Sequence, residues 1–155
     1  KAGPAMSAAL TLATQEHLDR LVALSGAFAG ETGLAHDPEH RAAALAPLLS
    51  GTSPHGAVYV IGPARAPVGY VALSFGWSLE FGGLDAVIDE IYVRPRVRGR
   101  GVATQVLQGL ATALRGAGVC GLHLEVAQDD EKTQKLYRKA GFAPRDGYHL
   151  MSRAL

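Results

Sequence analysis

Hydrophobic and polar residues repeat with two different periods along this chain, and each period predicts a type of element. Strand-like apolar runs occupy residues 7–13, 57–62, 68–78, 84–93, 120–127 and 147–155. Helical spacing predicts four helices: one capped by Thr14, one opened by Asp37 and Pro38 and stopping near Gly51, one over 99–116 and one over 131–142. Pro47 should kink or shorten the second helix. The predicted order is β-α-α-β-β-β-α-β-α-β, with an extra short strand at 142–144 left open.

The connections between these segments predict how the strands pair. A short PARAP link joins the strands at 57–62 and 68–78, which fits a hairpin. The strand, helix and strand within residues 84–127 require a right-handed crossover and therefore a parallel pair. The sequence thus predicts an α/β fold with a single mixed, mostly antiparallel sheet and helices on both faces. We expect one domain over residues 6–155 and interpret residues 1–5, KAGPA, as a leftover of protein expression.

Composition and charge exclude several classes of protein. Hydrophobic residues make up 48% and charged residues 19% of the 155 positions, which is typical of a globular domain rather than a disordered chain. The net charge of +1 disfavours a dedicated nucleic-acid binder. No apolar run approaches the roughly 18 residues needed to cross a bilayer. The lone Cys120 excludes an internal disulfide and disfavours a metal site. A cytoplasmic protein is expected.

The segment RPRVRGRGVA, Arg94 to Ala103, concentrates four arginines and two glycines between a predicted strand and a predicted helix. The first N–H groups of a helix lack partners and lie at the positive end of its dipole, so they bind anions. Gly99 and Gly101 let the backbone approach such a ligand closely. We predict a phosphate site here, although such turns also occur without a ligand. Neither the GxGxxG nor the GxxxxGK[ST] fingerprint fits, which disfavours a dinucleotide.

At these residues the chain resembles the GCN5-related N-acetyltransferases (GNAT family). The family's acetyl-coenzyme A motif, Q/R-x-x-G-x-G/A, matches twice, over residues 96–101 and 98–103. The segment LYRKAGF, Leu136 to Phe142, is similar to the family's second recurrent motif. The element order agrees over residues 7–155. The resemblance implies a GNAT-like acyl-CoA transferase fold with acetyl-CoA as the acetyl donor.

The resemblance also implies which residues hold the coenzyme. Backbone amides of the turn would bind its pyrophosphate, arginine side chains would add charge-assisted bonds, and the strand edge ending at Val93 would pair with the pantetheine arm. The expected contacts are Ile91, Tyr92, Val93, Arg98, Gly99, Arg100, Gly101, Val102, Ala103 and Thr104. The resemblance also implies a coenzyme contact at Asp130, a position where many relatives carry asparagine.

Acetyl transfer to an amine needs a base and a proton donor. Asp89 and Glu90 are both candidate bases, and the choice between them stays open, as does a structural salt bridge. Strand alternation should send them to opposite faces and different environments. Tyr137, within LYRKAGF, is expected from the resemblance to protonate the leaving thiolate.

Several other residues with reactive or aromatic side chains are weaker candidates for the functional site. Glu80 could line an acceptor pocket with Trp77, Phe81 and Tyr148, although hairpin aromatics are also common in cores and dimer contacts. His123 and Glu125 are interpreted as structural or solvent-facing. Cys120 is interpreted as a small buried residue rather than a nucleophile.

The resulting hypothesis is an acetyl-CoA-dependent N-acetyltransferase acting by direct attack of a primary amine. The acceptor stays open among a polyamine, an aminoglycoside-like compound, an amino acid and a peptide or protein amine. Two alternatives come from other classes: a catalytically silent acyl-CoA sensor on the same fold, and a nucleic-acid-binding module that uses the arginines. We expect no nucleic-acid or membrane partner and leave a homodimer open.

Overall fold

In a computed structural model the chain divides into two compact units, Lys1–Glu125 and Val126–Leu155, of which residues 9–155 are described. The first unit contains, in order, β1 (Leu10–Leu12), η1 (Gln15–His17), α1 (Leu18–Thr32), α2 (Pro38–Leu49), β2 (Gly56–Ile61), β3 (Gly69–Ser78), β4 (Gly83–Val93), η2 (Pro95–Val97), α3 (Val102–Gly116) and β5 (Gly121–Leu124). The second unit contains α4 (Glu131–Lys139). A single domain over residues 6–155 stays a prediction, and residues 1–5 lie outside the described part.

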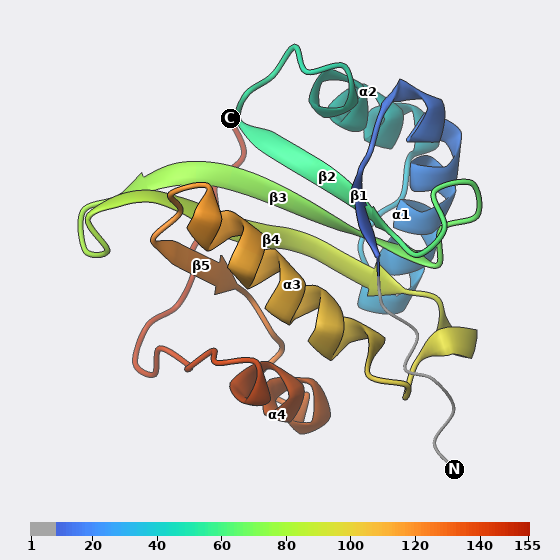
Figure 1. The fold of residues 1–155 in the computed structure, drawn as a ribbon. Helices are drawn as coiled ribbons and strands as arrows, with labels where there is room; N and C mark the ends of the chain where they lie inside the picture. The colour runs from blue at the N-terminus through green and yellow to red at the C-terminus, as the bar shows by residue number, and fades with distance from the viewer. Residues whose placement is uncertain (1–8) are drawn as a thin grey trace. The chain divides into compact units, whose positions relative to one another are not determined.

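The first unit is built on one five-stranded sheet in the order β1-β2-β3-β4-β5 (Figure 1). Three strand pairs, β1–β2, β2–β3 and β3–β4, are antiparallel. Only β4 and β5, which α3 connects, run parallel within this sheet of the described chain. This arrangement confirms the predicted mixed, mostly antiparallel sheet.

Helices cover both faces of this sheet, as predicted. On one face, apolar residues of α1 and α2 pack against strand residues in a single cluster that includes Leu21, Leu24, Leu45, Leu49, Val58, Val60, Tyr70, Ala72 and Tyr92. Figure 1 shows α3 crossing the opposite face. That helix buries Val106, Leu107, Leu110 and Leu114, whose spacing of three or four residues forms one apolar stripe. Burying each such side chain contributes about 1.5–3 kcal/mol.

Local signals account for the start and end of α2. The Asp37 carboxylate accepts hydrogen bonds from the N–H groups of Glu39 and His40, at 3.0 and 3.3 Å, and Pro38 occupies the first helical position. Pro47 lies in the last turn, and the helix ends only two residues later, at Leu49. The predicted helix start is therefore confirmed, and Pro47 accompanies the helix end.

The predicted strand at 147–155 is wrong, and no strand forms at 142–144 either. Every residue from 147 to 155 is solvent-exposed and outside regular structure. An alternating pattern makes a strand only when a neighbouring strand accepts its hydrogen bonds and a core covers one face, and this segment has neither in the described chain. The strand predicted at 120–127 is shorter than expected, because β5 comprises only Gly121–Leu124.

Candidate functional site

A β-bulge interrupts β4 at Asp89. Ala72 of β3 pairs with Glu90, whereas the next residue, Leu73, pairs with Ile88, so Asp89 has no partner on β3. On the other side of β4, the parallel pairing with β5 ends at Ile88 and Leu124. Asp89 therefore marks the point at which β4 loses its second neighbour.

Beyond the bulge, β4 has one edge without a strand partner in the described chain. The Arg94 N–H bonds to the Val68 carbonyl beside β3, at 2.7 Å. Since main-chain groups of successive strand residues point to alternate sides, those of Ile91 and Val93 face the unpaired edge and those of Tyr92 face β3. Among the three predicted strand contacts, the geometry favours Ile91 and Val93 for pairing with a ligand.

The turn after β4 leads into the first N–H groups of α3. Gly99 and Gly101 have φ angles of 76° and 77°, and Gly101 is the N-cap of α3. A Cβ at either glycine would touch nothing within 4 Å, so the left-handed backbone, rather than crowding by the protein, requires glycine there. The N–H groups of Val102, Ala103 and Thr104 have no acceptor among the described residues. They lie at the positive end of a 15-residue helix, as an anion site requires.

Arg98 stabilises this turn from within the protein. Its Nε donates to the Val93 carbonyl at 2.7 Å, and its Nη2 lies 2.8 and 3.0 Å from the two carboxylate oxygens of Glu31 on α1. The guanidinium also lies over the Tyr92 ring, 5.4 Å from its centroid. The Arg98 side chain thus links the turn to β4 and α1 while staying 44% exposed, and Arg100 is exposed as well.

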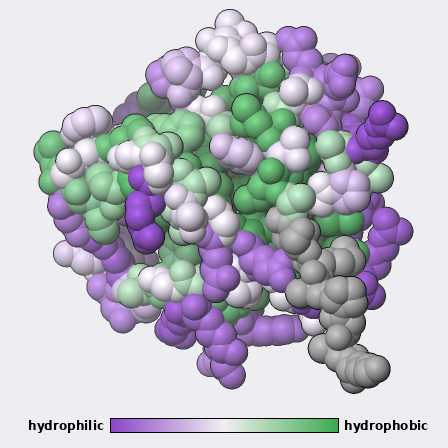
Figure 2. All heavy atoms as spheres, viewed as in Figure 1, coloured by the Kyte–Doolittle hydropathy of each residue, from purple (hydrophilic) through white to green (hydrophobic). Residues whose placement is uncertain are grey.

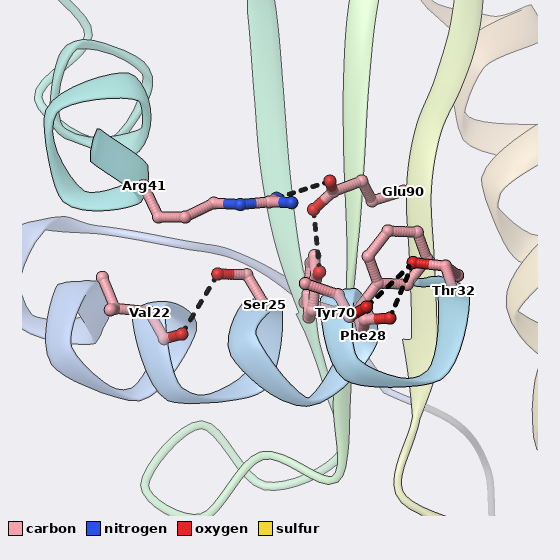
Figure 3. Close-up of polar contacts among 8 residues, drawn as sticks. Val22, Ser25, Phe28, Thr32, Arg41, Tyr70 and Glu90 are labelled. Carbon is pink, nitrogen blue, oxygen red and sulfur yellow. Dashed lines mark hydrogen bonds and ion pairs between the residues drawn. The ribbon is translucent and has the colours of Figure 1, made fainter. Parts of the chain in front are cut away.

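A buried polar network holds Glu90 beside the bulge (Figure 3). Arg41 of α2 donates from Nη1 to Glu90 Oε2 at 2.5 Å, and the Tyr70 hydroxyl donates to Oε1 at 2.9 Å. The Arg41 and Glu90 side chains are only 17% and 14% exposed. Burial, followed by the charge and hydrogen bond of Glu90, raises the pKa of Tyr70 well above its ordinary value, so Tyr70 stays protonated. Both carboxylate oxygens of Glu90 are therefore engaged.

Nothing in the sequence pattern singled out Arg41 or Tyr70 as residues of the site. Arg41 is separated from Glu90 by 49 residues, and nothing in the pattern of α2 distinguishes it from an exposed arginine. Tyr70 belongs to an apolar strand in which a packing role was the simplest interpretation.

Asp89 differs from Glu90 in its exposure and its contacts. Its side chain is exposed and makes no hydrogen bond within the described chain. Partial burial of the carboxylate, and then the negative charge of Glu90, raise the pKa of Asp89. The positive charge of Arg41 lowers this pKa, and the negative charge of Glu125 raises it further. Strict alternation fails at these two acids, because Glu90 pairs with Ala72 and Ile88 with Leu73 on either side of the bulge. The predicted difference in environment is observed, since Arg41 and Tyr70 hold Glu90 whereas Asp89 is exposed.

The second unit contains the other two predicted site residues. Asp130 is the N-cap of α4, and its carboxylate accepts from the Thr133 N–H at 3.0 Å. Hydrogen bonding to the Thr133 side chain, and then to its backbone N–H, lowers the pKa of Asp130. Tyr137, on the same helix, lies edge-to-face with Phe142 at 6.0 Å. Burial and then the charge of Asp130 raise the pKa of Tyr137, which keeps its hydroxyl protonated.

The secondary candidates near the β3–β4 hairpin are more exposed than expected. Trp77 is 72% and Phe81 is 46% exposed, so neither belongs to the core of the first unit. His123 pairs with Asp85 at 3.1 Å and lies edge-to-face with Phe81. The prediction that Cys120 is buried is wrong: Cys120 is exposed, and its thiol donates to the Leu84 carbonyl at 3.2 Å.

Comparison with known proteins identifies the family of this chain. The family model described as the acetyltransferase (GNAT) family matches residues 31–142. The chain belongs to this family. Membership confirms the resemblance seen in the sequence, and it indicates acetyl transfer as the class of reaction.

Solved structures agree with this GNAT assignment. An integron cassette protein from the mobile metagenome of the Cole Harbour salt marsh is 31% identical, with 94% of this chain and 90% of that one covered and a TM-score of 0.79. A putative acetyltransferase from Arthrobacter is 25% identical over 99% of both chains, with a TM-score of 0.78. The fold is also shared with AAC(6')-Iy, solved with a bisubstrate analogue of CoA and acetylneamine, at 16% identity, 95% and 98% coverage and a TM-score of 0.76. The GNAT-like fold class is thereby confirmed.

Among the helices of residues 9–155, none is both long and apolar enough to cross a bilayer.

Proposed function

We propose that this GNAT protein is an acetyl-CoA-dependent N-acetyltransferase that moves an acetyl group from the thioester to a primary amine. The observation that carries the proposal is the continuity of β4: an unpaired edge begins at the Asp89 bulge and leads directly into the Gly99–Gly101 turn and the first N–H groups of α3. One end of this track suits an extended amide-bearing arm, and the other suits a pyrophosphate.

Coenzyme binding follows from these backbone groups. The N–H groups of Val102, Ala103 and Thr104 would hold the pyrophosphate, with Gly99 and Gly101 giving the turn its left-handed shape. The main-chain groups of Ile91 and the N–H of Val93 would pair with the pantetheine amides, since the Val93 carbonyl already accepts from Arg98. Arg98 would help by holding the turn in shape through its bond to the Val93 carbonyl, and Arg100 would attract the phosphates by its charge. Asp130 would contribute by capping the start of α4.

Asp89 is the proposed general base. A lysine-like amine has a pKa near ~10.4 and must lose a proton before it attacks. Glu90 cannot take that proton without giving up Arg41 or Tyr70, whereas Asp89 has no hydrogen bond to lose within the described chain. A raised pKa also makes the Asp89 carboxylate a better proton acceptor near neutral pH.

The reaction balances when two protons leave the acceptor nitrogen and one reaches the sulfur. The ammonium first gives a proton to Asp89, directly or through water, and Asp89 passes it to solvent. The neutral amine then attacks the thioester carbonyl and forms the C–N bond while the C–S bond breaks. Asp89 takes the second proton from the nitrogen, and the leaving thiolate takes a proton from Tyr137, which regains one from solvent. The raised pKa of Tyr137 supports this role, since the hydroxyl retains its proton until the thiolate develops.

The acceptor is proposed to be a cationic amine. Asp89, Glu90 and Glu125 place three carboxylates around the bulge against the guanidinium of Arg41, and the two uncompensated negative charges would attract a second cationic group on the acceptor.

An amine panel tests the proposal. Thiol release from acetyl-CoA is followed with a polyamine, an aminoglycoside, an amino acid and a peptide, while coenzyme binding is measured separately. Turnover with at least one amine supports an enzyme. Coenzyme binding without turnover on any amine favours the silent sensor, and salt-sensitive nucleic-acid binding without coenzyme affinity favours the nucleic-acid module.

A further inference from the structure

Four arginines of the first unit surround a hollow of about 280 Å³ that is separate from the glycine turn. Arg20 comes from α1, Arg65 from the β2–β3 loop, and Arg94 and Arg96 from the segment that follows β4. Ala23, Ala66 and Pro67 complete the lining. Figure 2 shows purple, hydrophilic residues along the side where Figure 1 draws α1 and this loop. We call this feature the arginine pocket.

The walls of the arginine pocket are tied together by the backbone of the β2–β3 loop. Arg20 Nη1 donates to the Ala64 carbonyl at 3.4 Å, and Arg94 Nε donates to the Pro67 carbonyl at 3.5 Å. The loop itself is closed by hydrogen bonds from Ala66 to Pro63 and from Val68 to Ile61, at 3.0 and 2.8 Å. These two contacts are long for hydrogen bonds, so they place two of the four guanidiniums beside the loop without fixing them.

Within the described part of the chain, no carboxylate forms an ion pair with these four arginines. Ion pairs instead join Arg41 to Glu90, Arg98 to Glu31 and His123 to Asp85. The whole chain has a net charge of only +1, so the arginine pocket is a local concentration rather than part of a basic surface. Like charges around one concavity repel one another, and a bound anion would relieve that repulsion.

Arg98 therefore makes different contacts from Arg94 and Arg96. Arg98 contacts the Val93 carbonyl and Glu31, whereas Arg94 and Arg96 line the arginine pocket. The lining includes none of residues 99–104, which form the proposed coenzyme site. Guanidinium forks match phosphate oxygens two at a time, and the volume exceeds that of a single phosphate group.

The geometry points to the arginine pocket as a second anion site, which takes a small molecule with two linked phosphate groups independently of acetyl-CoA. This inference does not depend on acetyl transfer, because a silent coenzyme sensor would have the same pocket.

Inorganic pyrophosphate is the probe that tests the second site. Its binding to the full chain is measured by calorimetry at low ionic strength, first alone and then with the protein saturated by coenzyme A. We expect binding in both cases, since the two sites use different residues. Displacement of pyrophosphate by coenzyme A would overturn the inference, because the probe would then occupy the glycine turn. Absence of binding at millimolar pyrophosphate would overturn it as well.

A pair of variants locates the binding. Arg20→Gln/Arg65→Gln removes two charges of the arginine pocket without changing the turn, and we expect pyrophosphate affinity to fall at least about tenfold while coenzyme affinity is unchanged. Arg115→Gln/Arg153→Gln is the matched control, since it removes two exposed arginines elsewhere and should change pyrophosphate affinity less than about twofold. If the two double variants lose pyrophosphate affinity equally, the effect comes from net charge alone, and a defined site is refuted. All four positions are exposed, so unchanged melting temperatures are expected.

Discussion

Replacing Arg41 by methionine tests whether the network around Glu90 stabilises the junction of α2 with β4. Methionine keeps the length of the side chain and a high helix propensity, so α2 itself should form as before. The guanidinium 2.5 Å from Glu90 Oε2 is lost, and Glu90 keeps only the hydrogen bond from Tyr70. The substitution therefore leaves a carboxylate without its cation in a site where it is 14% exposed.

The expected cost follows from that burial. Removing one partner of a buried ion pair costs about 3–5 kcal/mol, whereas an exposed pair is worth about 0–1 kcal/mol. Side chains that are 17% and 14% exposed lie nearer the buried limit. We therefore expect Arg41→Met to lower the free energy of unfolding by about 2–4 kcal/mol at pH 7.

A double-mutant cycle with Glu90→Gln separates the ion pair from packing. Glutamine can still accept from Tyr70 but carries no charge, so Arg41→Met should cost at least about 1 kcal/mol less when it is combined with Glu90→Gln than when it is made alone. Urea unfolding followed by far-UV circular dichroism is the suitable assay, because the only tryptophan, Trp77, is 72% exposed and reports weakly on the core. A loss below about 1 kcal/mol in the single variant, or strict additivity in the cycle, would refute the reasoning.

Further variants test the proposed chemistry and the turn. Asp89→Asn should lower turnover by about 10²–10⁴-fold with coenzyme binding retained, and an unchanged rate in the amine assay would exclude Asp89 as the base. Because the pKa of Asp89 is raised, the folded state binds this proton more tightly than the unfolded state. The stability of the wild type should therefore fall as the pH rises from the ordinary aspartate range to the raised pKa. Urea unfolding midpoints measured across pH should show this fall in the wild type and not in Asp89→Asn. Gly101→Ala should weaken coenzyme binding and destabilise the turn, whereas Gly109→Ala within α3 should stabilise the protein by about 0.5–1 kcal/mol; the same sign at both positions would contradict a conformational role for Gly101. Tyr137→Phe should lower kcat while leaving coenzyme affinity within about twofold, and an unaltered kcat would remove Tyr137 as proton donor.

The local features of the protein were predictable because they depend on residues close together in the chain. Asp37 and Pro38 start α2 through contacts that reach only three residues. Gly99 and Gly101 form the turn through their own φ angles, and the apolar stripe of α3 follows from its period. The motif at residues 96–103 is similarly contiguous, which is why the family could be recognised before the fold was known.

The tertiary structure decided what depends on two distant segments. A bulge is a mismatch between two strands, so the release of Asp89 from alternation could not be derived from β4 alone. The assignment of Glu90 depends on Arg41, 49 residues away, and on Tyr70 from the adjacent strand. The failed strand at 147–155 has the same origin, because its apolar residues suggested a strand but no neighbouring strand of the described chain completed its hydrogen bonds.

The four arginines of RPRVRGRGVA combine both cases. Sequence placed them at the start of a helix and predicted an anion there from the backbone of the turn. Only folding directed Arg98 toward Glu31 and brought Arg94 and Arg96 beside Arg20 and Arg65. Backbone conformation is set largely by neighbouring residues, whereas the partner of a long charged side chain depends on which distant segment folds within its reach.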